Sequence, residues 1–186
     1  ARCREAGVRV RTFRCRPRNP LFFSFGLLMA LPRLMREAER VCIHGCWTFP
    51  VWWAARCARK ARVPCLHSPH GSLAPLSLNR GRLRKALAWR LFDRQALRGA
   101  DLLHATSERE AQWLRDALGA ACPPIRVTPL GVDGATLDAV PPQPRTNVFL
   151  FLGRLHPLKG LDLLAEAWGK AGLWPAWELH VVGPKD

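Results

Sequence analysis

The chain has 186 residues, of which 48% are hydrophobic and 23% are charged, a composition that excludes a disordered or low-complexity protein. Its net charge of +15 is uneven, because residues 1–100 hold 21 Lys and Arg against 4 Asp and Glu, whereas residues 101–186 hold 8 against 10. Such a basic half suits an anionic partner: nucleic acid, an acidic membrane surface or a phosphorylated substrate.

The first part of the chain alternates apolar strand patterns with amphipathic helix patterns. Side chains that alternate over 7–15 predict a half-exposed strand. The apolar stretch 21–32 is shorter than the roughly 20 residues that a membrane-spanning helix needs, so we expect a loop and a core helix, with helical periodicity over 31–40. Further strands are predicted over 40–45, 63–71, 101–107 and 125–133, and further helices over 50–61, 80–100 and 107–118.

This strand–helix order predicts an α/β fold with a parallel sheet and helices on both of its faces. In such sheets, ligands bind outside the carboxyl ends of the strands. The proline-rich segment 140–147 interrupts the order. Three prolines in five residues can neither continue a helix nor fill a central strand, so the segment is expected to be a linker.

A second strand–helix–strand unit follows over 147–153, 160–172 and 177–183. We therefore expect a first domain over 1–140, a linker over 141–147 and the beginning of a second domain over 148–186. A sheet needs more than two strands and the first residue is not Met, so we expect both domains to be incomplete and the chain to be a fragment.

The cysteines form no C-x-x-C pair, and their spacing fits neither a zinc site nor a disulfide framework. We expect reduced thiols in a cytoplasmic protein, several of them filling the core, with no bound metal. The seven are Cys3, Cys15, Cys42, Cys46, Cys57, Cys65 and Cys122.

The strongest local signal is the turn GRLHPLKG at 153–160. Arg154 and Lys159 lie five positions apart at the entry to a helix, and no carboxylate occurs from 148 to 161. A helix N-terminus offers unpaired N–H groups and partial positive charge, to which a guanidinium and an ammonium add. The turn predicts a diphosphate cradle; it is neither a Walker loop nor a dinucleotide loop, and two solvated surface cations are the alternative.

Five stretches in a fixed order carry a family resemblance: HGCW (44–47), SPHGSL (68–73), HATSE (104–108), PLGVD (129–133) and FLGRLHPLKGLDLL (151–164). From about residue 40 the chain resembles the retaining glycosyltransferases of family 4, the group 1 type with the GT-B fold. The resemblance implies two Rossmann-like domains that face each other across a cleft. It also implies transfer of a hexose, with retention, from a nucleoside-diphosphate sugar to a glycan or lipid-linked acceptor in surface polysaccharide or lipopolysaccharide synthesis.

The resemblance assigns roles to residues by matching motif. Arg154 and Lys159 are implied to contact the donor diphosphate, and His70 to orient or polarise the donor sugar. His67 is expected to be structural, and His44 ranks below His70. The glycines expected to shape the donor site are Gly71, Gly153 and Gly160, and the residues expected to shape the cleft are Gly131, Val132 and Asp133.

No cofactor is expected, because the nucleotide sugar is a substrate, and Asp133 is not expected to act as a catalytic base. The family's Gly-rich loop would precede residue 1, and its paired glutamates would follow residue 186. We therefore expect residues 1–186 alone to be inactive.

The main alternative is a basic nucleic-acid-binding or membrane-binding module without catalysis. The tryptophans of the chain fall mostly on apolar helical faces, and the sequence contains no nucleic-acid-binding motif. No nucleic-acid partner is therefore expected. The chain lacks the G-x-S-x-G elbow that a hydrolase would have. It also gives no support for a phosphorylase or an epimerase. A further expectation is peripheral contact of the basic helix, through Arg82, Arg84 and Lys85, with an anionic membrane at its inner face. The excess of basic residues is equally consistent with a codon-composition bias, because 24 of them are Arg and only 5 are Lys.

Overall fold

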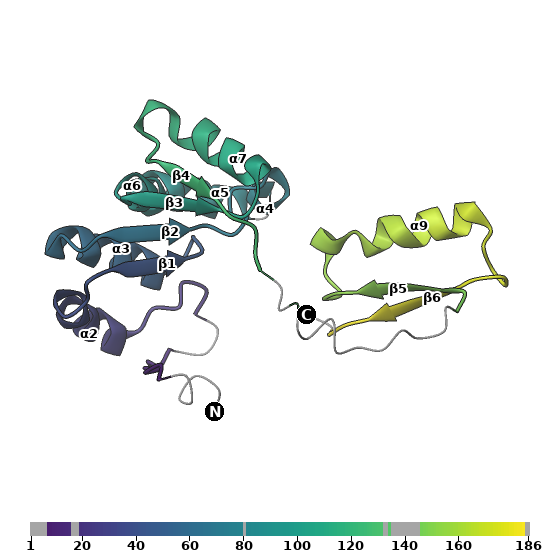
Figure 1. The fold of residues 1–186 in the computed structure, drawn as a ribbon, viewed down its shortest axis with the longest axis horizontal. Helices are drawn as coiled ribbons and strands as arrows, with labels where there is room; N and C mark the ends of the chain where they lie inside the picture. Colours follow the sequence, from purple (N-terminus) through teal and green to yellow (C-terminus); the bar gives the residue numbers. More distant parts are fainter. Residues whose placement is uncertain (1–6, 16–18, 80, 132–133, 135–145, 185–186) are drawn as a thin grey trace. The chain divides into compact units, whose positions relative to one another are not determined.

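The computed structural model describes residues 7–15, 19–79, 81–131, 134 and 146–184. It has two parallel sheets, one in each of two compact units, Ala1–Leu130 and Gly131–Asp186 (Figure 1). The predicted α/β class with parallel, Rossmann-like sheets is confirmed. The predicted linker lies almost wholly outside the described residues, and the predicted domain boundaries stay predictions.

The first unit is built on a four-stranded parallel sheet. The strands follow one another in space in the order of the chain, and the register sets His44 opposite Ser68 and Ala105 opposite Val127. Because all four strands run the same way, the segments that leave their carboxyl ends meet at one edge of the sheet. The strands are β1 (Val41–His44), β2 (Cys65–Ser68), β3 (Leu102–Ala105) and β4 (Ile125–Val127).

Helix α2 (Phe25–Arg36) starts earlier and ends earlier than the predicted helix 31–40, and it contains Pro32 in its interior. Ser24 caps its first turn by accepting a hydrogen bond from the N–H of Leu27 at 3.4 Å. Pro32 has no N–H to offer the carbonyl of Leu28, and the indole N–H of Trp53 takes that place at 3.0 Å. A partner on the next helix thus makes the interior proline tolerable. None of the helices in the described ranges has the length and apolar character needed to span a bilayer.

The predicted strand at 7–15 is wrong. Residues 8–15 belong to no sheet in the part of the chain that the structure describes, and the side chains of Val8 and Val10 are exposed. Alternation supplies one apolar face, but a strand also needs a neighbour that takes up its backbone hydrogen bonds. The sequence pattern carried no information about that neighbour.

Helix α3 (Phe49–Ala61) agrees with its prediction, with Pro50 in the first turn. The helix predicted over 80–100 is right in extent but is not α-helical throughout. It consists of α5 (Arg82–Ala88), the π-helical turn η1 (Trp89–Asp93) and α6 (Arg94–Arg98), after a short α4 (Pro75–Asn79).

The π-helical turn coincides with a buried carboxylate. Asp93 is fully buried, and one of its oxygens accepts a hydrogen bond from the N–H of Trp47 at 2.9 Å. Burial raises the pKa of Asp93 above its ordinary value. The widened turn therefore accommodates an inward-facing acid that anchors the segment after β1.

The core of the first unit lies between its sheet and helices. Leu97 and Leu103 are fully buried, and so are Leu114 and Leu118 of helix α7 (Glu108–Leu118). Cys42, Cys46, Cys57, Cys65 and Cys122 are free thiols, and burial raises the pKa of the Cys65 thiol to about 11. The prediction that several cysteines fill the core is confirmed by Cys46, Cys57 and Cys65.

The second unit contains β5 (Val148–Leu152) and β6 (Glu178–Val182), which pair in parallel. They are connected through η3 (Pro157–Lys159) and helix α9 (Leu161–Ala171), which lies along one face of the strand pair (Figure 1). The rings of Phe149 on β5 and Trp168 on α9 pack with their centroids 6.0 Å apart. The predicted strand–helix–strand order is confirmed.

Candidate active site

Three histidines gather at the carboxyl edge of the first sheet. His44 ends β1, His70 follows β2 by two residues, and His104 lies in β3. Nδ1 of His44 lies 2.8 Å from Nε2 of His70, so one ring donates a hydrogen bond to the other, and the two rings are stacked. The ring of His104 approaches His70 edge-on, with centroids 6.5 Å apart. Both His44 and His70 are exposed and available to a ligand.

His104 is the structural member of this group. Its Nε2 lies 2.8 Å from the carbonyl oxygen of Thr128, which only accepts, so Nε2 carries the proton. In the neutral ring, Nδ1 then accepts a hydrogen bond from the hydroxyl of Ser68 at 2.7 Å. His104 thereby ties β2, β3 and the segment after β4 together.

His67 is also structural, as its side chain is fully buried and Nε2 donates to the carbonyl of Gly45 at 2.8 Å. Burial lowers the pKa of His67, which favours the neutral ring. Across the described ranges, no three His, Cys, Asp or Glu side chains converge as a metal site requires.

Glu110 holds the turn that carries His70. Its carboxylate is 4% exposed and accepts hydrogen bonds from the N–H of Gly71 at 2.6 Å, from the N–H of Thr106 at 2.8 Å and from the hydroxyl of Thr106 at 2.7 Å. The turn has a left-handed backbone, with φ of 52° at His70 and 70° at Gly71. Because a non-glycine residue resists this conformation, the fixed carboxylate helps to hold His70 in place.

The sequence suggests a different role for Glu110. It occupies the capping-box position of α7, where its side chain would reach back to the N–H of Ser107. The structure confirms half of the box, since the hydroxyl of Ser107 accepts from the N–H of Glu110 at 3.2 Å. The carboxylate instead bonds the turn 39 residues earlier in the chain.

Replacing Glu110 by Gln is expected to lower the free energy of unfolding by about 1–3 kcal/mol at pH 7, because the amide presents a donor to N–H groups that need an acceptor. Burial alone would raise the pKa of Glu110, but the hydrogen bonds from Gly71 and Thr106 outweigh it and lower the pKa below its ordinary value of 4.5. The carboxylate therefore stabilises the fold above pH 4.5, and this contribution is lost as the pH falls further, through the lowered pKa.

Urea unfolding of both proteins between pH 3 and 7 tests this role. The difference between wild type and Glu110→Gln should shrink as the pH falls below 4.5. A difference that is constant over the whole range would show that the charge of Glu110 contributes nothing.

The second unit carries the two predicted diphosphate ligands on one turn. Arg154 follows Gly153 after the end of β5, and Lys159 ends η3, one residue before the start of α9 at Leu161, with both side chains exposed. Hydrogen bonds fold this turn, from the N–H of Lys159 to the carbonyl of His156 at 2.8 Å and from the N–H of Leu164 to the carbonyl of Gly160 at 3.0 Å. The structure thus places both cations at the carboxyl end of a strand and at the start of a helix.

Gly160 is the N-cap of α9 in the left-handed conformation, with φ of 67° and no side-chain cap. The first turn of α9 also contains Asp162, which follows the acid-free stretch of the sequence. The exposed carboxylate of Asp162 is attracted by the positive N-terminal end of the helix, to which a phosphate would also bind. An anion at this turn therefore depends on the side chains of Arg154 and Lys159 as well as on the helix.

Gly183 is a site residue that sequence reasoning missed. It follows β6 and approaches the turn so closely that a Cβ there would lie 1.8 Å from the carbonyl oxygen of Gly153. The N–H of Gly153 also donates to the carbonyl of Val182 at 3.0 Å. The backbone at the base of the predicted diphosphate turn is therefore packed directly against the end of β6.

Gly183→Ala is expected to destabilise the second unit by about 1–3 kcal/mol, the usual cost of forcing atoms into a filled space. Hydrogen exchange read by mass spectrometry should show faster exchange in β5 and β6. Gly169→Ala is the matched control, because a Cβ at this helical position meets nothing within 4 Å and alanine favours a helix. Equal exchange in the two variants would contradict the close approach.

The remaining predicted residues are placed only in part. Gly71 lies in the Glu110-bonded turn, and Gly131 lies exposed after β4. Val132 and Asp133 lie outside the described residues. Sequence reasoning missed Glu110 as the residue that holds the turn, and it did not predict the contact between His44 and His70.

Comparison with known proteins agrees with these motifs. Residues 1–131 match the glycosyl transferase 4-like domain. The chain is 30% identical over 158 residues to the D-inositol 3-phosphate glycosyltransferase of Kineococcus radiotolerans, covering 78% of this chain and 36% of that protein. It is 33% identical over 152 residues to the enzyme of that name from Geodermatophilus obscurus, covering 72% of this chain and 33% of that protein.

The chain thus spans about a third of the length of the curated relatives it matches. The family match covers the whole of the first unit, which contains the His44–His70 pair and the Glu110-bonded turn. The chain belongs to the glycosyl transferase 4-like family, the group 1 glycosyltransferases.

Proposed function

We propose that the full-length protein transfers a glycosyl group from a nucleoside-diphosphate sugar to an acceptor hydroxyl. The observation that carries the proposal is the turn after β5, where Arg154 and Lys159 lie between a strand end and a helix start. The membership in the glycosyl transferase 4-like family supports it.

Two cations at this turn suit the chemistry of the donor. When the bond between the sugar C1 and the diphosphate breaks, negative charge grows on the leaving nucleoside diphosphate. The guanidinium of Arg154 can bond two oxygens at once, and the ammonium of Lys159 adds a compact charge. Charge stabilisation that grows toward the transition state accelerates the reaction.

His70 is the proposed contact to the donor sugar. It is exposed at the carboxyl edge of the first sheet, its backbone is fixed by the Glu110-bonded turn, and its ring is oriented by His44. We propose that it bonds a sugar hydroxyl and orients C1 for attack. The acceptor hydroxyl then replaces the diphosphate on the same face of the sugar, and its proton passes to an oxygen of the departing diphosphate as the new bond forms. No metal or cofactor is assigned a role.

The transferred group is proposed to be a hexose, with the anomeric configuration retained. A glycan or lipid-linked acceptor, in surface polysaccharide or lipopolysaccharide assembly, is one candidate. The name of the relatives, D-inositol 3-phosphate glycosyltransferase, points to a second candidate, a phosphorylated polyol. The basic first half of the chain suits a phosphorylated acceptor of either kind.

We also propose that the protein is located in the cytoplasm and that α5 makes peripheral contact with an anionic membrane. Arg82 and Arg84 are exposed, as are the neighbouring Leu83 and Leu87, which could enter the headgroup region. Lys85 does not belong to this surface, because it donates to the carbonyl of Ser77 and lies over the ring of Trp47.

A transfer assay tests the proposed function. The full-length protein is incubated with uridine- and guanosine-diphosphate hexoses and with either inositol phosphate or a lipid-linked glycan, and release of nucleoside diphosphate is followed. One donor should be consumed in an acceptor-dependent way, and NMR of the product should show the donor's anomeric configuration. Residues 1–186 alone should give no turnover. Absence of turnover by the full-length protein with every donor would overturn the proposal.

A further inference from the structure

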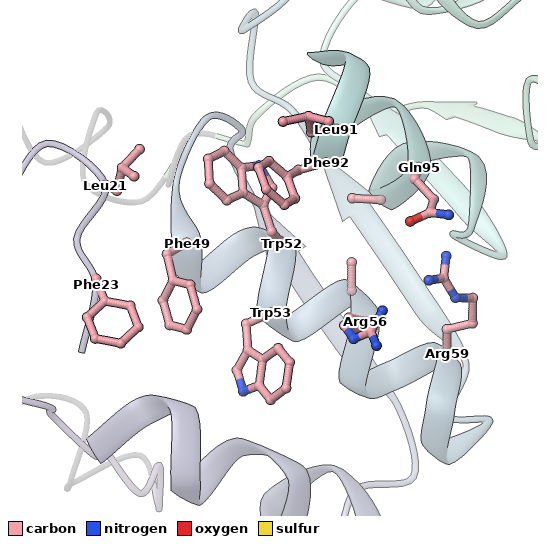
Figure 2. Close-up of a pocket in the computed structure, with 12 residues that line it drawn as sticks. Leu21, Phe23, Phe49, Trp52, Trp53, Arg56, Arg59, Leu91, Phe92 and Gln95 are labelled. Atoms are coloured by element: carbon pink, nitrogen blue, oxygen red, sulfur yellow. The ribbon is translucent and has the colours of Figure 1, made fainter. Parts of the chain in front are cut away.

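An aromatic groove of about 520 Å³ lies beside α3, and its lining includes none of the candidate active-site residues. Figure 2 shows Phe49, Trp52 and Trp53 of α3 facing the groove, with Leu91 and Phe92 of η1 across from Trp52. The volume is within the range of about 300–1,000 Å³ typical of small-molecule pockets. The other lining residues are Leu21, Phe23, Ala55, Arg56, Arg59, Gln95 and Ala96.

The groove wall is built from stacked rings and remains partly open to water. Trp52 and Phe92 stack with centroids 4.4 Å apart, and Phe49 packs on Phe23 at 4.7 Å and on Trp53 at 6.3 Å. Phe23 is 43% exposed and Phe92 is 44% exposed. Ordered but exposed aromatic side chains in a hollow indicate a surface that accepts an apolar ligand.

A second hollow of about 270 Å³ adjoins the groove and shares Trp53 and Arg56 with it. Its lining adds two more cations, Arg36 from the last turn of α2 and Lys60 from α3. Arg36, Arg56 and Lys60 are all exposed. Neither hollow has a carboxylate in its lining, as far as the described residues show.

Arg56 and Lys60 are four positions apart on α3, and both line the second hollow. The two cations therefore face the same small volume, one helical turn apart. An aromatic groove that ends in a cationic hollow is complementary to a molecule with an apolar chain and an anionic head.

We propose that the two hollows together bind a lipid phosphate, with the alkyl chain along Trp52, Trp53 and Phe92 and the phosphate between Arg36, Arg56 and Lys60. The binding does not depend on the proposed glycosyl transfer, because the groove contains neither His70 nor Arg154 or Lys159. A protein without transferase activity would retain it.

Calorimetric titration of the full-length protein with decyl phosphate, kept below its micellar concentration, tests the site. Saturable one-to-one binding is expected, whereas inorganic phosphate and the neutral decyl maltoside should each bind at least about tenfold more weakly, since each lacks half of the ligand. Failure of decyl phosphate to bind, as would occur if another segment of the chain filled the groove, overturns the proposal. Equal binding of decyl maltoside overturns the role of the cations.

Paired variants locate the binding. Arg56→Glu with Lys60→Glu should weaken decyl phosphate binding by at least about tenfold, whereas Arg109→Glu with Arg115→Glu, the same charge change at exposed positions of α7, should leave it within about twofold. If the first pair does not fold, as judged by circular dichroism, Arg56→Gln with Lys60→Gln replaces it. Equal weakening in both pairs would mean that net charge alone attracts the ligand, and would overturn the site.

A second pair of variants tests the apolar part of the proposed site. Phe92→Ala should weaken binding by about fivefold or more, because the chain loses an aromatic surface. Leu163→Ala, at a side chain that is 68% exposed on α9, should have no effect. Unchanged binding by Phe92→Ala would overturn the placement of the alkyl chain.

Discussion

Replacing both Arg154 and Lys159 by alanine is expected to lower kcat/KM for the nucleotide sugar by at least about a thousandfold in the full-length enzyme. The reason is that both side chains lie on the turn after β5, which is the proposed site of the departing diphosphate and its growing negative charge. The loss should appear in kcat as well as in KM, because the charge grows toward the transition state. Steady-state kinetics with the preferred donor measures it.

Two controls separate this effect from a general loss of positive charge. Lys170→Ala removes a cation of α9 that is paired with Glu166 at the surface, and it should leave kcat/KM unchanged within about twofold. Arg154→Lys keeps the charge but loses the fork of the guanidinium, and it should cost about tenfold. If the double variant retained the activity of Lys170→Ala, the assignment of the turn would be wrong.

Replacing His70 by alanine is expected to lower kcat by about a hundredfold, the lower end of what a positioned acid, base or orienting group contributes. Glu110 holds the turn that carries His70, and Nε2 of His70 lies 2.8 Å from Nδ1 of His44. These contacts hold the side chain of His70 in one orientation. His44→Ala should cost about tenfold, since the ring of His70 then loses a fixed partner. Rapid-quench measurement of a single turnover isolates the chemical step from product release.

His180→Ala is the matched control for a lost imidazole, because His180 is exposed on β6 and its partner is Glu178 of the same strand. It should leave kcat unchanged. A His70→Ala enzyme as fast as this control would remove His70 from the reaction and leave it as a turn residue.

The parts of the fold that the sequence predicts correctly are those set by local pattern. The helix over 161–171 and the strands beside it follow from apolar periodicity and from glycines at the turns. The turn with Arg154 and Lys159 is predictable for the same reason, since the strand end, both cations and the helix start lie within a dozen residues.

Interactions between distant segments explain the failures. Pro32 lies inside a helix because the indole of Trp53 takes over the carbonyl that the proline leaves free. Glu110 meets the N–H of Gly71 across 39 residues, and His44 meets His70 across 26. Such pairs follow from strand order and register, which periodicity in a single sequence does not encode.

The strand predicted at 7–15 fails for a related reason. Its alternating pattern is real, but no neighbouring strand pairs with it in the described part of the chain. The close approach of Gly183 to Gly153 was equally hidden, because both glycines look like ordinary turn residues until the parallel pairing of β5 and β6 brings their backbones together.

Direct titration of a nucleoside diphosphate into the full-length protein, followed by calorimetry, bears most closely on the assignment of the turn after β5. The wild type should bind the nucleotide of its preferred donor in a saturable way, and the Arg154→Ala, Lys159→Ala double variant should bind it at least about a hundredfold more weakly at equal salt. Equal affinity of the two proteins would contradict a diphosphate site at this turn.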